Sequence, residues 1–535
     1  MRRPKEPTSK RKLRRGLFGM GLFRIGILLA GLLWWGPGGG GSGGTLAYGQ
    51  TGEAGGELVR ALETRVQQVL AECERSVVAI ARLPRDDGEQ GFQIPQFQAP
   101  TLGRLGPQLG GLGSSGAVAL DADFVPSDFG AGVVLDHERR IVTAYHVIGR
   151  IADSQFFVWS AQRPFRARVL AADPWTDLAV LQVEGGDFRP IPLGKGDQVA
   201  QGQFVVALGN PQAIGRDGRL SAAWGLVANR LRRAPRTTEL TASPAARETL
   251  HHHGTLLQTD ARLDPGFRGG ALLNLQGELI GLLTAYSGGA REARFAGFAI
   301  PVDETFRTAV DQLKAGKVPE FGFLGVGPQS PGMDYRIRQQ GRHGVAVETV
   351  LAGSPAARAG IQVGDVITHA AGQVLYDDDD LFRVVGAHPP TYRLPVTVFR
   401  GDFAQGRGER LERVAVLEKK RVVARRPEYS TAPPERWRGL QVDYASIAVH
   451  ENVGLAERIP AEGCVYVVSV ERDSPVWQAG VRRGMFVTQI VAGGPVTHVA
   501  TPAEFFAAAR RAAGEAVTLR ALNEQGAVST HTVSP

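Results

Sequence analysis

Cysteine is nearly absent from this chain of 535 residues, which contains only Cys73 and Cys464. Two cysteines cannot build a disulfide framework, and their wide separation places them in different domains. We therefore expect two separate thiols rather than a bridge. The length exceeds what one hydrophobic core supports, and a typical domain of about 100 to 200 residues predicts three or four units.

Net charge is also nearly absent beyond the first 50 residues. The chain carries a formal charge of +8, of which residues 1–15 contribute +7 and Arg24 contributes one more. Everything from Thr51 onward is close to neutral, which removes the electrostatic footprint of a nucleic-acid-binding protein. We expect no nucleic acid among the partners.

The basic excess belongs to a leader and spacer, residues 1–56. Its apolar run, residues 25–35, has the length found in signal peptides. Extended back to Gly16, the run is long enough to span a bilayer with Arg24 inside. A cleaved signal peptide and an uncleaved anchor both remain open, and both place the body across a membrane, in the periplasm or cell envelope. An internal buried helix fits poorly with a basic flank and the glycine-rich run 36–44.

The region after the spacer predicts one amphipathic helix and then many short strands. Residues 57–70 place apolar side chains on one helical face. Between Ser76 and about Pro301, β-rich runs alternate with Gly and Pro, which is typical of a sandwich or barrel. The expected strands are 76–80, 132–135, 156–159, 178–183, 204–208 and 279–283. The inserts 84–128 and 231–254 lack periodicity and are expected to be surface loops.

An internal repeat occupies the last third of the chain. The segment Ser-Pro-Ala-Ala-Arg-Ala-Gly that begins at Ser354 recurs in similar form from Ser474, 120 residues later. Two copies predict two similar domains, residues 321–418 and 437–535. A basic linker, residues 419–436, joins them, and residues 57–312 remain for the β-rich domain.

The β-rich domain lacks a hydroxyl where its pattern calls for one. A trypsin-type site needs a hydroxyl, an imidazole to take its proton and a buried carboxylate to orient that imidazole. His146, at the end of an expected strand, and Asp177 supply the last two. In chain order the hydroxyl should follow in a tight glycine turn whose N–H groups form an oxyanion hole. Arg268 stands there, between Gly266 and Gly269, and its guanidinium has no lone pair to offer a carbonyl.

Several ordered motifs resemble the HtrA family of trypsin-like serine proteases. They are Thr-Ala-Tyr-His at 143–146, Thr-Asp-Leu-Ala-Val-Leu at 176–181, Ala-Leu-Gly-Asn-Pro at 207–211, Gln-Thr-Asp at 258–260, Gly-Gly-Ala-Leu-Leu-Asn at 269–274 and Gly-Phe-Ala-Ile-Pro at 297–301. The repeated segments resemble PDZ domains, which follow the protease in that family. The resemblance covers residues 57–535. It implies a mainly β fold, with a two-barrel trypsin-like domain followed by two PDZ-like α+β domains, and a homotrimer.

The family's turn reads Gly-Asn-Ser-Gly-Gly, and here Phe267 and Arg268 replace Asn and the nucleophilic Ser. Loss of the nucleophile typically costs about a million-fold in turnover. Nearby Ser221 and Ser287 offer little rescue. If Arg268 points inward, it should oppose protonation of His146 and pair with Asp177.

Three functions remain open for a chain with this substitution. The first is an exported pseudoprotease that binds unfolded or C-terminal segments in envelope protein quality control. The others are an active serine endopeptidase with an unrecognised nucleophile, and a regulatory subunit of active paralogues. In the first, His146 and Asp177 persist as triad remnants, either as a structural pair or as part of a site that holds peptide.

The PDZ-like copies predict a second kind of site, for extended peptide ends. Such a domain adds a peptide to its sheet edge and holds the terminal carboxylate with N–H groups of a glycine-containing loop. The resemblance places this loop at Phe323, Leu324, Gly325 and Val326 in the first copy, and at Gly439 and Leu440 in the second. In the second copy, Gln441 takes the place of the loop glycine, which weakens the prediction. The alternative for either copy is a docking module.

Two further clusters are assigned no ligand. The adjacent histidines 251–253 lack the separated spacing of a metal site, so we expect no metal and no cofactor. The acidic run 377–380 precedes an apolar stretch and favours the N-terminus of a helix. Attraction of basic peptides or calcium is the alternative for that run.

Overall fold

The computed structural model describes residues 50–85, 128–160, 163–210, 220–234, 249–284, 297–329, 342–422, 427–492, 494–512, 514–523 and 525–535. Residues 1–49 of the predicted leader and spacer lie outside these residues, as do most of both predicted inserts. The chain separates into two compact units, 1–59 and 60–535. Within the described part, no helix combines the length and the apolar character needed to cross a membrane.

The second unit begins within α1 (Gln50–Cys73) and continues into a β-barrel. The strand order is β21-β5-β4-β1-β2-β3-β6, and β5 also pairs with β6, which closes the barrel. Alternate side chains fill its interior, among them Ile80, Val134 and Leu181. The strand bounds are β1 (Val77–Pro84), β2 (Asp128–Val134), β3 (Arg140–Ala144), β4 (Ser154–Ser160), β5 (Arg163–Asp173) and β6 (Leu178–Val183).

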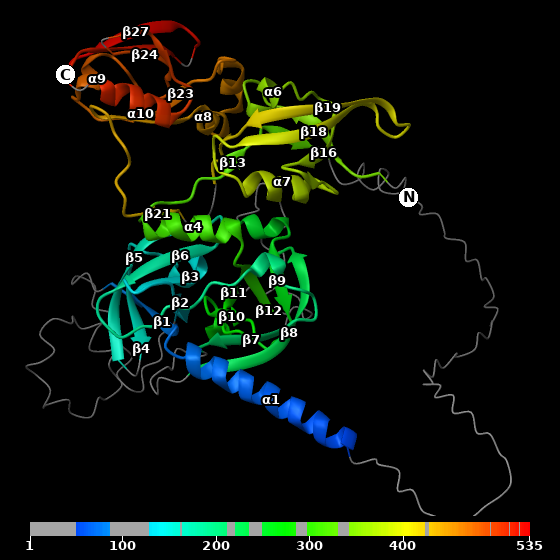
Figure 1. Cartoon of the computed structure of the whole chain (residues 1–535). Helices are drawn as coiled ribbons and strands as arrows, with labels where there is room; N and C mark the ends of the chain where they lie inside the picture. Colours follow the sequence, from blue (N-terminus) through cyan, green and yellow to red (C-terminus); the bar gives the residue numbers. More distant parts are fainter. Residues whose placement is uncertain are drawn as a thin grey trace, which may run out of the picture. The chain divides into compact units, whose positions relative to one another are not determined.

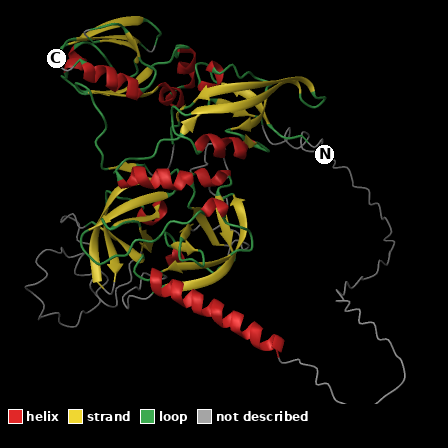
Figure 2. Cartoon of the chain, viewed as in Figure 1, coloured by secondary structure: helices red, strands yellow, loops and turns green. Residues whose placement is uncertain are grey.

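A second closed barrel follows, with the strand order β10-β11-β12-β9-β8-β7. Its strands are β7 (Phe204–Gly209), β8 (Ser221–Arg232), β9 (Leu256–Thr259), β10 (Ala271–Leu273), β11 (Leu279–Thr284) and β12 (Gly297–Pro301). Figures 1 and 2 show the two groups of curved strands. Helix α4 (Glu304–Lys314) begins at the N-cap Asp303 and buries Phe306, Val310 and Leu313. The mainly β, two-barrel prediction is therefore confirmed.

The first repeat copy forms an α+β domain, called PDZ1 below. Its sheet has the order β14-β15-β16-β18-β19, with β17 paired to β16 and a separate β13–β20 pair. The bounds are β13 (Gly322–Phe323), β14 (Val326–Pro328), β15 (Val345–Val350), α6 (Pro355–Arg358), β16 (Val366–Ala370), β17 (Gln373–Val374), α7 (Asp378–Gly386), β18 (Arg393–Asp402), β19 (Arg407–Val416) and β20 (Glu418–Lys419).

The second copy, PDZ2 below, repeats this arrangement with the order β22-β23-β24-β26-β27 and β25 paired to β24. Its elements are β22 (Leu440–Tyr444), α8 (Ala445–Glu451), η9 (Val453–Arg458), β23 (Val465–Val470), α9 (Pro475–Gln478), β24 (Phe486–Val491), β25 (Thr497–His498), α10 (Pro502–Arg511), β26 (Val517–Leu522) and β27 (Val528–Val533). Ser354 and Ser474 cap α6 and α9 in the same way, each followed by Pro. The repeated sequence therefore encodes a repeated helix start.

The linker between the PDZ domains adds a strand to the first barrel. Strand β21 (Tyr429–Ser430) pairs with Ala171 and Ala172 of β5. The Tyr145 hydroxyl donates to the Pro427 carbonyl at 2.8 Å. The sequence did not predict this connection, because an isolated two-residue strand carries no periodicity.

Both cysteines are buried and free. Burial raises the pKa of Cys73 to about 11, and it also raises the pKa of Cys464. The prediction of two separate thiols is confirmed.

Candidate functional site

His146 and Asp177 come together beside the first barrel. His146 lies in the short helix α3 (Tyr145–Ile148) after β3, and Asp177 precedes β6. The imidazole Nδ1 lies 3.0 Å and 2.9 Å from the two carboxylate oxygens. The His146 backbone N–H donates to Oδ1 at 3.2 Å, and the Thr284 hydroxyl donates to Oδ2 at 2.9 Å. The carboxylate is therefore held from three sides.

The environment keeps Asp177 ionised. Burial alone would raise its pKa, but the nearby His146 and the hydrogen bonds from His146 and Thr284 outweigh burial and lower the pKa. Because a carboxylate only accepts, Nδ1 of His146 carries the proton in this contact. In the neutral imidazole, Nε2 then presents its lone pair.

Nε2 is the nitrogen that would take a nucleophile's proton. It is buried and has no hydrogen-bond partner among the described residues. The pair thus has the orientation of a general base with no described proton donor.

The turn that presents Asp177 is organised by Asp173, which is fully buried. Its carboxylate accepts from the backbone N–H groups of Trp175 at 3.1 Å and Thr176 at 3.0 Å. The Thr176 hydroxyl donates to it at 2.6 Å. Burial raises the pKa of Asp173 to about 6, although these hydrogen bonds oppose the shift. Asp177 follows with a φ of 54°, a strained conformation for a non-glycine residue.

Arg268 lies directly after the 3₁₀ turn η7 (Pro265–Phe267). Its Nη2 donates to the carbonyl of Phe129 in β2 at 3.4 Å, and its own carbonyl accepts from the Ala131 N–H at 2.7 Å. Burial lowers the pKa of the guanidinium, and Arg82 lowers it further. The hydrogen bond described for the Arg268 guanidinium therefore goes to β2. The hydrogen-bond donors described for the Asp177 carboxylate are His146 and Thr284.

The glycine turn keeps a tight geometry without the serine. Gly269 has a φ of 78°, and a Cβ there would lie 2.2 Å from the Thr143 hydroxyl oxygen. Its N–H donates to the Leu283 carbonyl at 2.7 Å, so this N–H supports the turn. The Gly266 carbonyl accepts from the Asn210 N–H at 3.1 Å. Phe267 is 3% exposed and belongs to the core of the second barrel.

The two alternative hydroxyls fall elsewhere. Ser221 is the first residue of β8 and pairs with Gly209. No described hydrogen bond links it to Nε2 of His146. Ser287 lies outside the described residues.

In PDZ1 the predicted carboxylate loop lies between β13 and the edge strand β14. Gly325 has a φ of 84°, and a Cβ there would lie 2.3 Å from Cβ of Ser354, so only glycine fits. Among the described residues, the N–H groups of Leu324 and Gly325 meet no backbone carbonyl. Two neighbouring N–H groups at a sheet edge match the chemistry of carboxylate capture.

In PDZ2, Gly439 is the counterpart of Gly325. Its φ is 85°, and a Cβ there would lie 2.4 Å from Cβ of Ser474. The carbonyls of Gly325 and Gly439 accept from the corresponding N–H groups of Leu351 and Glu471, at 3.0 Å and 2.8 Å. The prediction that Gln441 takes the place of the loop glycine was therefore wrong. The fold aligns Gly439, which lies two residues before Gln441, with Gly325 of PDZ1.

The PDZ2 loop differs from the PDZ1 loop in another way. The N–H groups of Arg438 and Gly439, like those of Leu324 and Gly325, meet no backbone carbonyl among the described residues, and the following Leu440 N–H donates to the Trp437 carbonyl at 2.8 Å. Arg438 stands before Gly439 as Leu324 stands before Gly325, and its guanidinium donates to the carbonyls of Ser534 at 2.8 Å and Glu515 at 2.7 Å. The loop of PDZ2 is thus tied into its own domain.

Two family models match the chain: a trypsin-like peptidase domain at residues 130–282 and a PDZ domain at residues 347–393. A curated relative from Arabidopsis thaliana, "Protease Do-like 1, chloroplastic", is 34% identical over 303 residues, or 54% of this chain and 64% of the relative. "Probable periplasmic serine endoprotease DegP-like" from Pseudomonas fulva is 32% identical over 275 residues, or 51% of this chain and 53% of the relative.

The chain resembles HtrA-type proteases in its trypsin-like peptidase domain and its PDZ domain. It matches between about half and two thirds of the length of these curated relatives. A solved structure titled "HtrA-type protease AlgW with tripeptide" shows 22% identity and a TM-score of 0.45, over 66% of this chain and 96% of that chain.

The side chains of the three adjacent histidines, residues 251–253, contact different partners. They form the buried 3₁₀ helix η6 (Leu250–His253). His251 Nε2 lies 2.8 Å from the Thr176 carbonyl, next to Asp177, and its pKa is lowered by burial. His252 Nδ1 lies 3.2 Å from the Thr249 hydroxyl. The third histidine, His253, contacts PDZ1.

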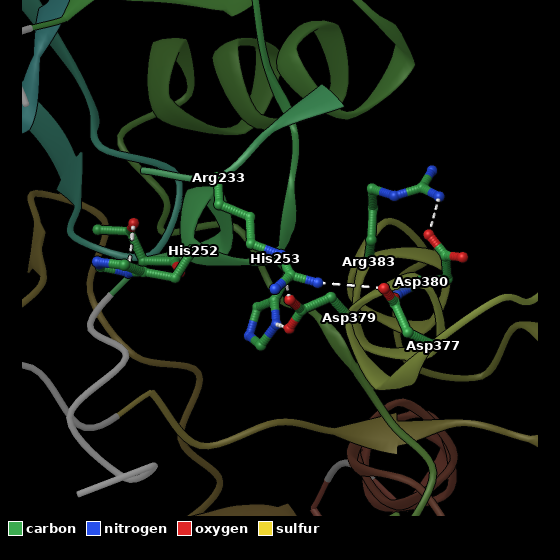
Figure 3. A network of polar contacts seen from close by, with 8 residues as sticks. Arg233, His252, His253, Asp377, Asp379, Asp380 and Arg383 are labelled. Carbon is green, nitrogen blue, oxygen red and sulfur yellow. Dashed lines mark hydrogen bonds and ion pairs between the residues drawn. The ribbon is translucent and has the colours of Figure 1, made fainter. Parts of the chain in front are cut away.

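His253 takes part in an ion-pair network with the start of α7 (Figure 3). Its Nδ1 lies 2.8 Å from Oδ1 of Asp379, and both side chains are 4% exposed. Arg233 lies 2.6 Å from the same carboxylate and 3.1 Å from Asp377. Asp377 also caps α7 by accepting from the Asp380 N–H at 3.0 Å. The helix-start prediction for the acidic run is confirmed, and the network gives that run a second role, in contact with the peptidase domain.

Sequence reasoning missed Trp175 and Lys420, which join the same region. The Lys420 ammonium lies 3.6 Å from the centroid of the Trp175 ring, and Phe321 lies beside that ring. Burial lowers the pKa of Lys420 to about 7. A charged residue in a linker gave no signal of burial, so only the fold could reveal this contact.

Proposed function

We propose that this HtrA-like chain binds unfolded or C-terminal polypeptide segments without hydrolysing them. The observation that carries the proposal is the guanidinium of Arg268, which stands where the family places its nucleophile. His146 and Asp177 keep a hydrogen-bonded pair, and Nε2 has no described partner. A base without a nucleophile cannot start acyl transfer, because the remaining members act only through the missing hydroxyl.

PDZ1 is the proposed peptide receptor. Its edge strand β14 can accept an extended peptide as a further strand. The N–H groups of Leu324 and Gly325 supply donors for a terminal carboxylate, and Phe323 and Val326 flank them. PDZ2 is the proposed docking module, since the Arg438 guanidinium, next to the loop glycine, is committed to carbonyls of its own domain.

We further propose export to the periplasm or cell envelope, and assembly into a homo-oligomer. Export is supported by the basic, apolar leader and by relatives named as periplasmic endoproteases. The leader would also supply the proposed contact with the membrane. Assembly is supported by an exposed aromatic pair on the second barrel: Phe204 and Trp224 stack at 4.7 Å, and each is 41% exposed. Exposed aromatic pairs are common at protein interfaces.

The test uses the purified chain, an unfolded casein substrate and a serine-directed phosphonate. We expect no cleavage and no covalent label, together with retention of peptides that have free C-termini. Covalent labelling of the unmodified chain would instead support the alternative of an active serine endopeptidase. Loss of retention after amidation of the peptide would show that the carboxylate is the group recognised.

A further inference from the structure

One segment of PDZ1, residues 351–358, supports the carboxylate loop; we call it the shared segment. The Leu351 N–H donates to the Gly325 carbonyl at 3.0 Å, and the Ala356 N–H donates to the Leu324 carbonyl at 2.9 Å. Ser354 lies so close to Gly325 that a Cβ on the glycine would come within 2.3 Å of it. The conformation of the loop therefore depends on this segment.

PDZ2 contacts the shared segment directly. A Cβ on Gly353 would lie 2.7 Å from Cβ of Ile459 and 3.1 Å from the Ala456 carbonyl oxygen. Leu351 packs against the apolar cluster that α8 and η9 form with β23. Ile459 and Ala456 are themselves 7% and 4% exposed. The helical part of PDZ2 thus packs an apolar surface against the shared segment of PDZ1.

A buried carboxylate fastens the two domains at the same place. Glu418 of β20 is 7% exposed, and it forms an ion pair with Arg358 of the shared segment at 2.6 Å. It also accepts from the Ser446 N–H, at the start of α8, at 2.9 Å. Glu418 pairs in register with Phe323 of the carboxylate loop. One residue therefore links the loop's strand through its backbone, and the loop's support and PDZ2 through its side chain.

We propose that PDZ2 braces the carboxylate loop of PDZ1 through the shared segment, so that PDZ1 holds peptide C-termini more tightly while PDZ2 is docked. This inference rests on the proposed peptide-binding function of PDZ1. Its physical basis is preorganisation: a loop already fixed in its binding conformation loses less entropy when the carboxylate arrives. PDZ2 then contributes to affinity without touching the peptide.

The test uses the full chain and a substitution that adds a methyl group at the contact between PDZ1 and PDZ2. In Gly353→Ala, the added methyl group collides with Ile459, and the residue has a φ of 64°. Gly364→Ala is the matched control, because Gly364 has a φ of 89° with no atom within 4 Å of an added Cβ. Both variants carry the same kind of backbone strain, and only the first disturbs the contact.

Binding is measured by fluorescence anisotropy with a labelled decapeptide that ends in valine, with a free or an amidated C-terminus. We expect Gly353→Ala to weaken binding of the free-carboxylate peptide about fivefold or more, and the control to change it less than about twofold. Because Gly353→Ala alters the shared segment itself, Ile459→Glu repeats the test from the PDZ2 side. It should give the same loss.

Amide hydrogen exchange separates failure of this inference from failure of the proposed function. Faster exchange at Ser446 reports undocking, and faster exchange at Leu351 and Ala356 reports loss of the brace. Undocking in either variant with unchanged exchange at Leu351 and Ala356, or with unchanged affinity, would overturn the brace. Absence of peptide binding by the wild-type chain would refute the receptor role of PDZ1, while the exchange data would still decide whether PDZ2 supports the loop.

Discussion

Nδ1 of His146 lies 2.9 Å from Oδ2 of Asp177, the separation of a working imidazole–carboxylate pair, although the chain has an arginine at the nucleophile position. The pair has a structural reason to persist. The Asp177 carboxylate is 5% exposed, and without the Nδ1–H of His146 it would keep the Thr284 hydroxyl as its described side-chain donor. A buried carboxylate that loses its donors is costly, so the fold favours retention of His146 even without catalysis.

Arg268→Ser asks whether this pair can still act. The new hydroxyl would lie on a turn whose glycine conformation is intact, and Nε2 has no described partner to compete for its proton. We expect phosphonate labelling to rise well above the wild-type background, measured by intact-protein mass spectrometry. The double variant Arg268→Ser/His146→Ala is the control and should stay unlabelled. Equal labelling of the single and double variants would show that the imidazole contributes nothing.

The buried carboxyl of Asp173 should make stability depend on pH. Its pKa in the folded chain is about 6, above the value near 3.9 of an unfolded Asp. The folded state therefore holds the proton more tightly, and this stabilisation is present below about pH 4 and is lost as the pH rises through 6. We expect urea unfolding to show a fall from pH 4 to 7 that is smaller in Asp173→Asn by up to roughly 3 kcal/mol.

Asp187→Asn is the control for the pH experiment, because the Asp187 side chain is 87% exposed. It should leave the pH dependence of the wild-type chain unchanged. An identical slope in the Asp173→Asn and Asp187→Asn variants would contradict the assignment of the effect to Asp173.

The contact between α7 and the peptidase domain should depend on Asp379. In Asp379→Asn, Arg233 and His253 lose their shared anion in a place where the carboxylate is 4% exposed. The Arg233 side chain is 52% exposed and stays solvated, so the cost is that of the lost charge-assisted hydrogen bonds to a buried group, typically about 1 to 3 kcal/mol. We expect a loss of roughly that size in thermal unfolding, and faster amide exchange along η6. Asp378→Asn, on the same helix turn but less buried, should behave like the wild-type chain.

The exposed aromatic pair should govern self-association. Trp224→Asp places a charge beside Phe204, at a position that is 41% exposed and needs no repacking in a monomer. We expect sedimentation velocity to show a shift from oligomer to monomer. Val363→Asp is the control, because Val363 is 65% exposed on PDZ1. A Trp224→Asp variant that sediments like the Val363→Asp variant would refute this surface as the interface.

Much of the fold was predictable from local signals. The run 178–183 is apolar except for Gln182 and forms β6, in which every residue but Gln182 is buried. The repeated segments at Ser354 and Ser474 predicted two similar domains, and each Ser-Pro begins a helix, because a serine cap and a proline at the first turn suit helix geometry. His146 and Asp177 could be named as candidates because their neighbouring residues form recognisable motifs.

Other features of the site depended on long-range contacts. Gly439 was named in the PDZ2 loop, but Gln441 was aligned with the glycine of the PDZ1 loop, because linear alignment could not show which residue has the positive φ beside Ser474. The burial of His253 and Asp379 could not be predicted either, since 126 residues separate them and each is polar. No local pattern marks a polar residue whose partner comes from another domain.

The sequence by itself determined the barrels, the repeated domains and the arginine that stands where the family has its serine, because periodicity, capping and residue chemistry are local properties. Only the tertiary structure decided where the guanidinium of Arg268 makes its contact, which residue of the PDZ2 loop is the counterpart of Gly325, and how Glu418 joins the two PDZ domains. These features depend on which distant surfaces are buried together. A charge or an N–H group gains or loses its partner there through packing, and not through its neighbours in the chain.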